Sequence, residues 1–239
     1  SAHKRKCQRL TNFKFRKDCL RLDWNQQTIQ KKMKNISDVI LSVDKGHGPD
    51  ILILVEVENM SILQQLNKNY LRNAGYKTIE LIPGEDPRGI NVAIMSRFKK
   101  YQESELISLN IIKDKGQDVL KTRGLLRVPL KVSEKIKLTV FGTHLPSQAS
   151  PTQVRRQAIE SINKIVKAEK NIWIVGGDFN ITEQEANREQ LISEELAQNG
   201  FVSHQVGCSL CQGTHYYKNK WSFLDLFYFD SRLKKQGFR

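Results

Sequence analysis

Asp178 and Asn180 are polar residues at the end of an apolar segment, and both are of types used in phosphate chemistry. They stand in Ile-Val-Gly-Gly-Asp-Phe-Asn (174–180), after a run from Ile172 to Val175 that is typical of a buried strand. In an extended segment, side chains two residues apart leave the same face. A carboxylate beside a carboxamide offers a hard-cation ligand or proton acceptor next to a group that can hold a phosphate oxygen. A simple strand-ending turn also favours these residues, so the segment alone fits both interpretations.

A second acidic motif, Glu56-Val57-Glu58-Asn59, follows the apolar segment 50–55. Alternation along a strand places Glu56 and Glu58 on one face. A buried carboxylate needs a partner such as a cation, so we predict that Glu56 is a metal ligand. Glu58 could alternatively cap the helix that follows.

A histidine and an aspartate occupy two further strand-like segments. His144 stands in Gly-Thr-His-Leu-Pro-Ser at a strand tip, where it is a candidate general acid or base, a phosphate ligand, or a structural histidine. Asp225 lies within a run of large apolar residues. A buried aspartate usually orients a histidine, binds a cation or accepts hydrogen bonds from backbone amides.

Three further residues are candidates for holding phosphate oxygens. Arg88 and Asn91 stand in Asp86-Pro-Arg-Gly-Ile-Asn, just before a strand, and Arg123 stands in Thr-Arg-Gly. A guanidinium group pairs well with phosphate. A surface salt bridge is the alternative for either arginine.

The composition describes a globular protein that attracts polyanions. Its 239 residues carry a formal charge of +14, which favours nucleic acid, anionic lipid or phosphorylated small molecules, although excess lysine can also serve solubility alone. No apolar run approaches the roughly 20 residues that span a membrane. The first residues lack the apolar region of a secretory signal, so a secreted or periplasmic location would require that a signal peptide was removed. We expect a soluble protein that is a monomer.

Among the four cysteines, Cys208 and Cys211 have three possible uses. Cys208 and Cys211 lie between His204 and His215 in His-x3-Cys-x2-Cys-x3-His, which has the ligand types of a structural zinc site. A Cys-x-x-Cys motif also forms a local disulfide or simply packs.

The elements that must position these residues alternate along the chain, which predicts one layered α/β domain. Apolar residues at helical spacing predict helices, and short apolar runs predict strands. The expected helices cover 26–44, 61–74 and 151–169, and the expected strands cover 50–55, 90–95, 125–132, 136–141, 172–175 and 221–229.

Taken in order, the motifs resemble those of the endonuclease/exonuclease/phosphatase superfamily (deoxyribonuclease I-like). The resemblance covers about residues 25–230 and looks closest to the bacterial branch that reads Glu-Val-Glu-Asn. It rests on Val-Glu56-Val-Glu-Asn, Asp86-x-Arg-Gly-Ile-Asn-Val-Ala-Ile-Met-Ser-Arg97, Thr-His144-Leu-Pro-Ser, Gly-Gly-Asp178-Phe-Asn180 and Trp221-x-x-Leu-Asp225.

The resemblance implies a four-layer α/β-sandwich, with two mixed β-sheets packed face to face and helices on the outside. It also implies roles: Glu56 would bind Mg²⁺, with Mn²⁺ or Ca²⁺ as alternatives, and Asp178 would activate water. Asn180 and His144 would contact the phosphate, and Asp225 would orient a final histidine. The implied activity is Mg-dependent phosphodiester hydrolysis, with nucleic acid as the expected substrate and partner.

The chain departs from the family pattern at both ends. We expect a single domain, 1–239, that lacks the usual first strand and the C-terminal Ser-Asp-His strand, since no histidine follows Asp225. Either the protein extends further or its catalysis is impaired. The alternatives are therefore a phosphomonoesterase or sphingomyelinase-like hydrolase on the same fold, and a catalytically impaired polyanion-binding member.

Overall fold

The computed structural model describes residues 7–9, 11, 13–21, 25–112, 119–203 and 210–236, which fall into two compact units, Ser1–Gly48 and Pro49–Arg239. In the first unit, a disulfide joins Cys7 to Cys19. Its helices are α2 (Phe13–Arg21) and α3 (Gln26–Leu41), followed by the 3-10 turn η1 (Asp44–Gly46). The side chain of Asn25 caps α3 by accepting a hydrogen bond from the backbone of Thr28.

The second unit contains two stacked sheets and a two-stranded hairpin. A small antiparallel sheet has the order β1-β3-β2, from β1 (Ile51–Val57), β2 (Thr78–Leu81) and β3 (Asn91–Ser96). The larger sheet has seven strands in the order β4-β6-β7-β8-β12-β9, with β5 also paired to β6. Its strands are β4 (Lys99–Lys100), β5 (Glu105–Ile107), β6 (Leu125–Lys131), β7 (Lys137–His144), β8 (Ile172–Asp178), β9 (Gly200–Ser203) and β12 (Asp225–Asp230).

Helices and short turns complete the second unit. The α-helices are α4 (Met60–Tyr70), α5 (Thr152–Ala168) and α6 (Glu183–Glu189), and a separate hairpin consists of β10 (His215–Tyr217) and β11 (Lys220–Ser222). The short helical segments are η2 (Arg72–Ala74), η3 (Leu191–Glu195), η4 (Leu196–Asn199) and η5 (Ser231–Gln236). None of the helices in the described ranges is long and apolar enough to cross a membrane.

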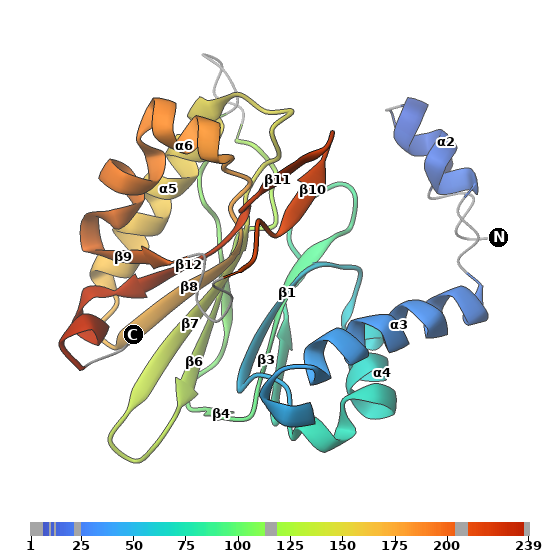
Figure 1. Ribbon diagram of the computed structural model, residues 1–239, viewed down its shortest axis with the longest axis horizontal. Coiled ribbons are helices and arrows are strands. Elements are labelled where there is room, and N and C mark those ends of the chain that lie inside the picture. The colour runs from blue at the N-terminus through green and yellow to red at the C-terminus, as the bar shows by residue number, and fades with distance from the viewer. Residues whose placement is uncertain are drawn as a thin grey trace. The chain divides into compact units, whose positions relative to one another are not determined.

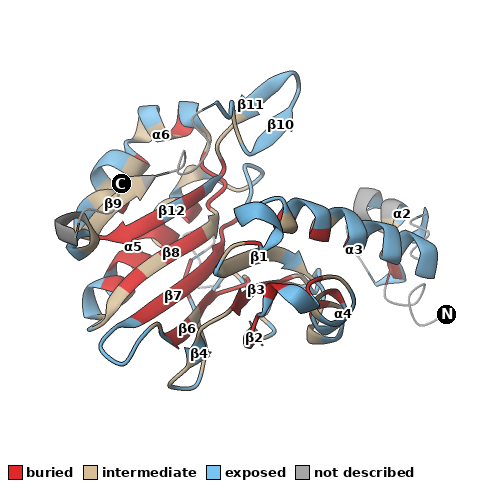
Figure 2. Cartoon of the chain, turned by 60° about the horizontal axis from the view of Figure 1, so that its bottom comes forward, coloured by how far each residue is buried: buried red, intermediate tan, exposed pale blue. Residues whose placement is uncertain are grey.

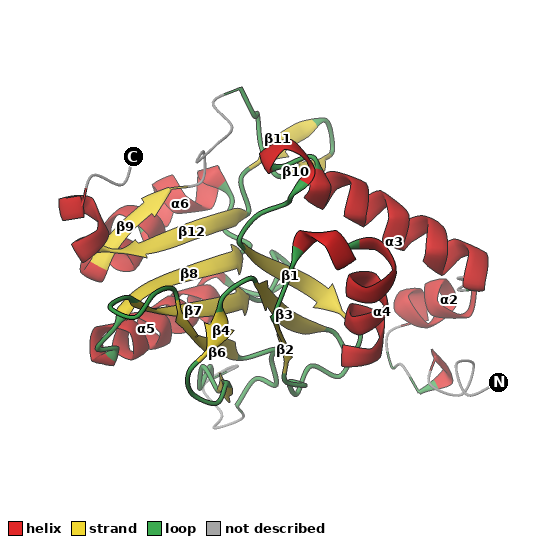
Figure 3. Cartoon of the chain, turned by 90° about the horizontal axis from the view of Figure 1, so that it is seen from below, coloured by secondary structure: helices red, strands yellow, loops and turns green. Residues whose placement is uncertain are grey.

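The sheets pack face to face, as Figure 1 and Figure 3 show. Period-two alternation sends Val140 and Ile94 into the core between the sheets, whereas Phe141 joins the core beneath α5. The close approach of the sheets requires small residues at their centre. A Cβ atom on Gly176 would lie 2.7 Å from the Cδ1 of Ile53. With α4 beside β2 and α5 over the larger sheet, the second unit has the expected four layers.

The predicted fold class is therefore confirmed, with differences in detail. Of the two sheets, the parallel pairing of β7 with β8 makes only the larger one mixed. The helix predicted over 61–74 is divided into α4 and η2 at Leu71. The strand predicted over 221–229 is interrupted at 223–224, which separates β11 from β12.

Candidate functional site

Three titratable residues meet at one end of the larger sheet. In the strand register, His144 at the end of β7 lies beside Asp178 at the end of β8, and Asp225 at the start of β12 lies opposite Asp178. The Nε2 atom of His144 is 3.5 Å from the Oδ2 atom of Asp178. The structure thus brings together three residues that the sequence places far apart.

Gly177 permits the close pairing of β7 and β8 that this cluster requires. Its φ of +139° lies in a region that side-chain-bearing residues rarely adopt, and an added Cβ would meet the carbonyl oxygen of Thr143 at 1.9 Å. A larger residue would therefore displace the backbone next to His144 and Asp178.

Asn180 lies beside Asp178, but not by strand alternation as we expected. The strand ends at Asp178, and Asn180 has a left-handed φ of 53°. Its backbone N–H donates to Oδ1 of Asp178 at 2.8 Å, and its Nδ2 donates to the carbonyl of Leu145 at 2.9 Å. The buried amide therefore joins the segment after Asp178 to the segment after His144.

Glu56 lies at a bulge in β1, and the structure leaves both Glu56 and Glu58 exposed, whereas our prediction for Glu56 assumed a buried carboxylate. The register with β3 shifts between Leu54 and Val57, and Glu56 has a φ of 59°. The bulge leaves the Glu56 side chain exposed and available to a ligand. The helix that follows is capped by Asn59, which accepts from the backbone of Ile62.

Asn91 supports this bulge from the neighbouring strand. Its Nδ2 donates to the carbonyls of Val57 (3.2 Å) and Glu58 (3.0 Å), and its Oδ1 accepts from the backbone of Gly84 (2.9 Å). These bonds use both amide hydrogens, which indicates that Asn91 positions the segment next to Glu56.

Asp86, which we had not selected as a site residue, connects the two arginines. Arg88 binds its carboxylate through Nε (3.1 Å) and Nη2 (3.0 Å), and the buried Arg123 donates to it at 2.7 Å. Arg123 also donates to the carbonyl of Leu145 at 2.8 Å. Burial alone would raise the pKa of Asp86, but the hydrogen bonds from both arginines lower it to about 2. Arg123 thus has a buried structural partner, whereas Arg88 remains partly exposed.

The electrostatics of the cluster set opposite protonation tendencies for His144 and Asp178. Burial raises the pKa of Asp178 to about 6, and the negative charges of Asp225 and Glu56 add to this rise. Burial also lowers the pKa of His144 to about 4, with a further contribution from Arg123 and Arg88. At neutral pH the pair is therefore a carboxylate beside a neutral imidazole.

A buried ion pair, which our sequence reasoning missed, holds the loop after His144. Arg155 on α5 binds Glu185 on α6 at 2.5 Å and donates to the carbonyl of Ser147 at 2.8 Å. Gln148 donates to Glu185 at 2.6 Å and to the carbonyl of Asn180 at 2.5 Å. The signal was in the sequence, because Arg155 falls on the apolar stripe of the predicted helix together with Ala158, Ile159 and Ile162.

The oxygen ligands at this site fit a hard cation. Burial is the main cause of the raised pKa of Asp178, and the negative charges of Asp225 and Glu56 add to it, so three carboxylates act on one another here. No preformed group of three or more ligands exists among the described residues. Mg²⁺ is commonly bound by one or two carboxylates together with several waters, so these carboxylates are of a type that could hold it.

The zinc hypothesis lies partly outside the described residues, since it includes His204 and Cys208. Cys211 is disulfide-bonded and so does not offer a thiolate. Within the described ranges no zinc-binding group is present.

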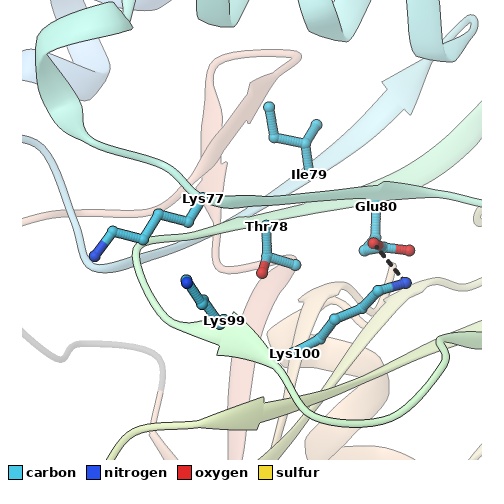
Figure 4. Close-up of a pocket in the computed structure, with 6 residues that line it drawn as sticks. All are labelled: Lys77, Thr78, Ile79, Glu80, Lys99 and Lys100. Atoms are coloured by element: carbon cyan, nitrogen blue, oxygen red, sulfur yellow. Dashed lines mark ion pairs between the residues drawn. The ribbon is translucent and has the colours of Figure 1, made fainter.

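A pocket of about 390 Å³ lies elsewhere, between β2 and β4 (Figure 4). Its lysines include Lys100, which pairs with Glu80 at 3.2 Å. The pocket borders Thr78, which pairs with Ser96, whereas the candidate site is at the Asn91 end of β3. At roughly 3.3 Å per residue, these ends are about 17 Å apart, so the pocket is separate from the site.

Comparison with known proteins gives one family match and several structural matches. The model of the Endonuclease/Exonuclease/phosphatase family matches residues 14–238. Comparison with curated proteins found no match.

Among solved structures, similarity is low in sequence and extensive in fold. A D. rerio TDP2 structure complexed with single strand DNA product has 20% identity and a TM-score of 0.59, covering 87% of this chain and 80% of that one. A Staphylococcus aureus beta toxin mutant with bound magnesium ions has 16% identity and a TM-score of 0.57, covering 83% and 77%. A family protein from Leptotrichia buccalis has 14% identity and a TM-score of 0.59, covering 86% and 83%.

Proposed function

The chain belongs to the endonuclease/exonuclease/phosphatase family, and we propose that it is a metal-dependent phosphodiester hydrolase acting on DNA or RNA. The observation that carries this proposal is the meeting of His144, Asp178 and Asp225 at adjoining strand ends. The Glu-Val-Glu-Asn motif at Glu56 supports a place in the bacterial branch.

In the proposed mechanism, Asp178 orients a water molecule and accepts its proton as the water attacks phosphorus in line with the leaving oxygen. The bond between phosphorus and the leaving oxygen breaks, and that oxygen takes a proton from solvent water. Its pKa of about 6 leaves it ionised at neutral pH yet basic enough to take the proton. The neutral His144 holds a nonbridging oxygen by hydrogen bonding.

The remaining residues bind and orient the phosphate. Arg88 offers its partly exposed guanidinium to a nonbridging oxygen, and Arg123 fixes Asp86 and the segment after His144. Asn180 holds the segment that carries Asp178 and contributes a second donor to the phosphate. Mg²⁺ bound chiefly by Glu56 would neutralise negative charge that develops on the phosphate.

Nucleic acid is the proposed substrate because the formal charge of +14 favours a polyanion. The similar D. rerio TDP2 structure contains a DNA product, and the similar beta toxin structure contains magnesium. These bound molecules support the proposed substrate class and metal.

A sphingomyelinase-like activity is the second candidate, because a lipid-active enzyme needs exposed apolar side chains and the residues at 216, 217 and 221 are exposed aromatics. Activity on DNA, RNA, phosphoinositides and sphingomyelin in Mg²⁺ separates the candidates. Release from DNA or RNA alone supports the nuclease. Release from sphingomyelin alone contradicts it, and Mg²⁺-independent nucleic acid binding without any hydrolysis indicates the impaired member.

We also propose that the protein matures in an oxidising compartment, because Cys7–Cys19 is a disulfide and Cys211 takes part in another. Thiol labelling of the unreduced, denatured protein should detect no free thiol. Four reactive thiols in protein isolated from its natural compartment would contradict this localisation.

A further inference from the structure

The β10–β11 hairpin carries exposed aromatic side chains that the proposed mechanism does not use. Tyr216, Tyr217 and Trp221 are 54%, 63% and 46% exposed. Figure 2 shows the hairpin projecting from the sheets with its residues coloured as exposed. An exposed aromatic cluster of this kind is typical of a binding surface.

Rings occupy both faces of the hairpin. Tyr216 pairs with Trp221 across the strands, and their ring centroids are 5.0 Å apart. On the other face the rings of His215 and Tyr217 are 6.2 Å apart. The hairpin therefore carries exposed rings on both of its faces.

Hydrogen bonds attach this hairpin to the site. The hydroxyl of Thr214 accepts from the backbone N–H groups of Leu224 and Asp225, each at 3.1 Å. The carbonyl of Leu224 accepts from the backbone of Phe179 at 2.8 Å. The base of the hairpin is thus fixed to both strands that carry Asp178 and Asp225.

The charge of the hairpin favours a single-stranded polyanion over a lipid surface. Residues 213–222 contain no aspartate or glutamate, and the Nζ of Lys218 lies 5.4 Å from the ring centroid of Tyr217. The tip is Lys218-Asn219, which is polar, whereas insertion into a bilayer requires an apolar tip. Rings interleaved with lysines match the chemistry that stacks bases and holds phosphates.

We propose that the β10–β11 hairpin is a stacking platform for the bases of single-stranded nucleic acid. The phosphodiester backbone of the bound strand would then be directed to the site at Asp178. This inference rests on the proposed function and extends it from a phosphodiester site to a preference for unpaired bases. A preference for unpaired bases would follow because stacked, paired bases do not expose their faces.

The test compares binding of a short single-stranded thymidine oligomer with an abasic phosphodiester oligomer of equal length. Fluorescence anisotropy with the full chain in EDTA measures binding without metal-dependent hydrolysis. We expect the wild-type protein to bind the thymidine oligomer about tenfold more tightly. The double variant Tyr216→Leu/Trp221→Leu keeps apolar contact across the strands but retains Tyr217, so it should lose most of this preference rather than all of it.

One control variant and one further hairpin variant accompany this test. Ile136→Ala removes a side chain that is 47% exposed at the opposite end of β7, and it should keep the tenfold preference. Tyr217→Leu leaves the Tyr216–Trp221 pair intact, so it tests stacking even if the double variant loses the hairpin. It should reduce the preference.

Several results would overturn the platform. Equal binding of both oligomers by the wild-type protein is one, and an unchanged preference in both hairpin variants is another. If the hairpin variants lose binding to phosphatidylglycerol vesicles but keep the wild-type preference for the thymidine oligomer, the hairpin is a lipid-binding element instead. Base preference without hydrolysis of any phosphodiester in Mg²⁺ would contradict only the proposed function, whereas hydrolysis without base preference would contradict only the platform.

Discussion

At the scale of single residues, the site depends on a carboxylate that is poorly hydrated and on a histidine that stays neutral. Asp178 is close to other carboxylates, whereas His144 is close to two arginines. Each environment opposes the charge that the group would carry in water. The strand register creates this arrangement, because His144, Asp178 and Asp225 have consecutive places across three strands.

The first prediction concerns the titration of these two residues in metal-free protein. The Asp178 carboxyl should titrate near pH 6 and the His144 ring near pH 4. Carbon and proton NMR of the labelled side chains measures both values. An Asp178 inflection near 4 would show that burial and neighbouring charges do not act as described.

The second prediction is that Asp178→Asn raises stability at neutral pH. The pKa of Asp178 in the folded protein is above its ordinary value of 3.8, so ionised Asp178 destabilises the fold. Wild-type stability contributed by this group is present below pH 4 and is lost as the pH rises through 6. The isosteric amide should recover on the order of 3 kcal/mol at pH 7.

Urea unfolding of the wild-type protein and the Asp178→Asn variant at pH 4 and pH 7 measures this difference. The amide can still accept from the backbone of Asn180, as Asp178 does at 2.8 Å. A variant that is less stable than wild type at pH 7 would contradict the prediction.

At the scale of elements, two helices hold the segments that carry the site. Arg155 on α5 and Glu185 on α6 join the loop after β7 to the segment after β8. Arg155 is 1% exposed, so loss of either partner leaves a buried charge uncompensated.

The third prediction is that Arg155→Met costs about 3 to 5 kcal/mol of stability. Glu185→Gln also leaves the Arg155 charge unpaired but keeps an amide oxygen that accepts from it, so in the fraction that stays folded it should lower kcat while KM stays near the wild-type value, because it loosens the positions of His144 and Asn180 without touching phosphate. Urea unfolding and steady-state kinetics on an oligonucleotide measure the two effects.

Arg127→Met is the matched control for this network. Arg127 pairs with Glu169 at 2.9 Å, and this pair lies on β6 and at the end of α5 rather than beside the site. Its loss should lower stability and leave kcat unchanged. If Arg127→Met lowers kcat as much as Glu185→Gln does, the Arg155–Glu185 pair has no special role in positioning the site.

Much of this element layout could be predicted from sequence, because periodicity reports burial directly. The apolar stripe of 151–169 and the apolar runs at 90–95 and 172–175 match α5, β3 and β8. The bulge at Glu56 could not be predicted, since the register shift depends on pairing with β3. The turn at Asn180 also breaks the alternation assumed for it, because the strand ends two residues earlier.

At the scale of the whole molecule, the family and the formal charge of +14 are the two properties that bear on the class of partner. The family could be predicted from the order and spacing of individually weak motifs, because the site draws residues from several distant strands. The partnership of Asp86 with two arginines could not, since it depends on the folded loop.

The fourth prediction follows from the formal charge of +14. Affinity for single-stranded oligonucleotides should fall linearly on a plot of log affinity against log salt, with a slope of about −0.7 for each phosphate neutralised. Anisotropy titrations over a salt series in EDTA measure the slope. Affinity that does not change with salt would contradict an electrostatic nucleic acid surface.

The proposed hydrolysis is tested most sharply with an end-labelled single-stranded oligonucleotide, wild-type protein and folded Asp178→Asn. We predict cleavage by the wild-type protein in Mg²⁺ and none in EDTA. The variant should cleave about 100- to 10,000-fold more slowly, because it lacks the group that accepts the proton from water. Cleavage by Asp178→Asn at the wild-type rate would contradict the role of Asp178 on which the proposed function depends.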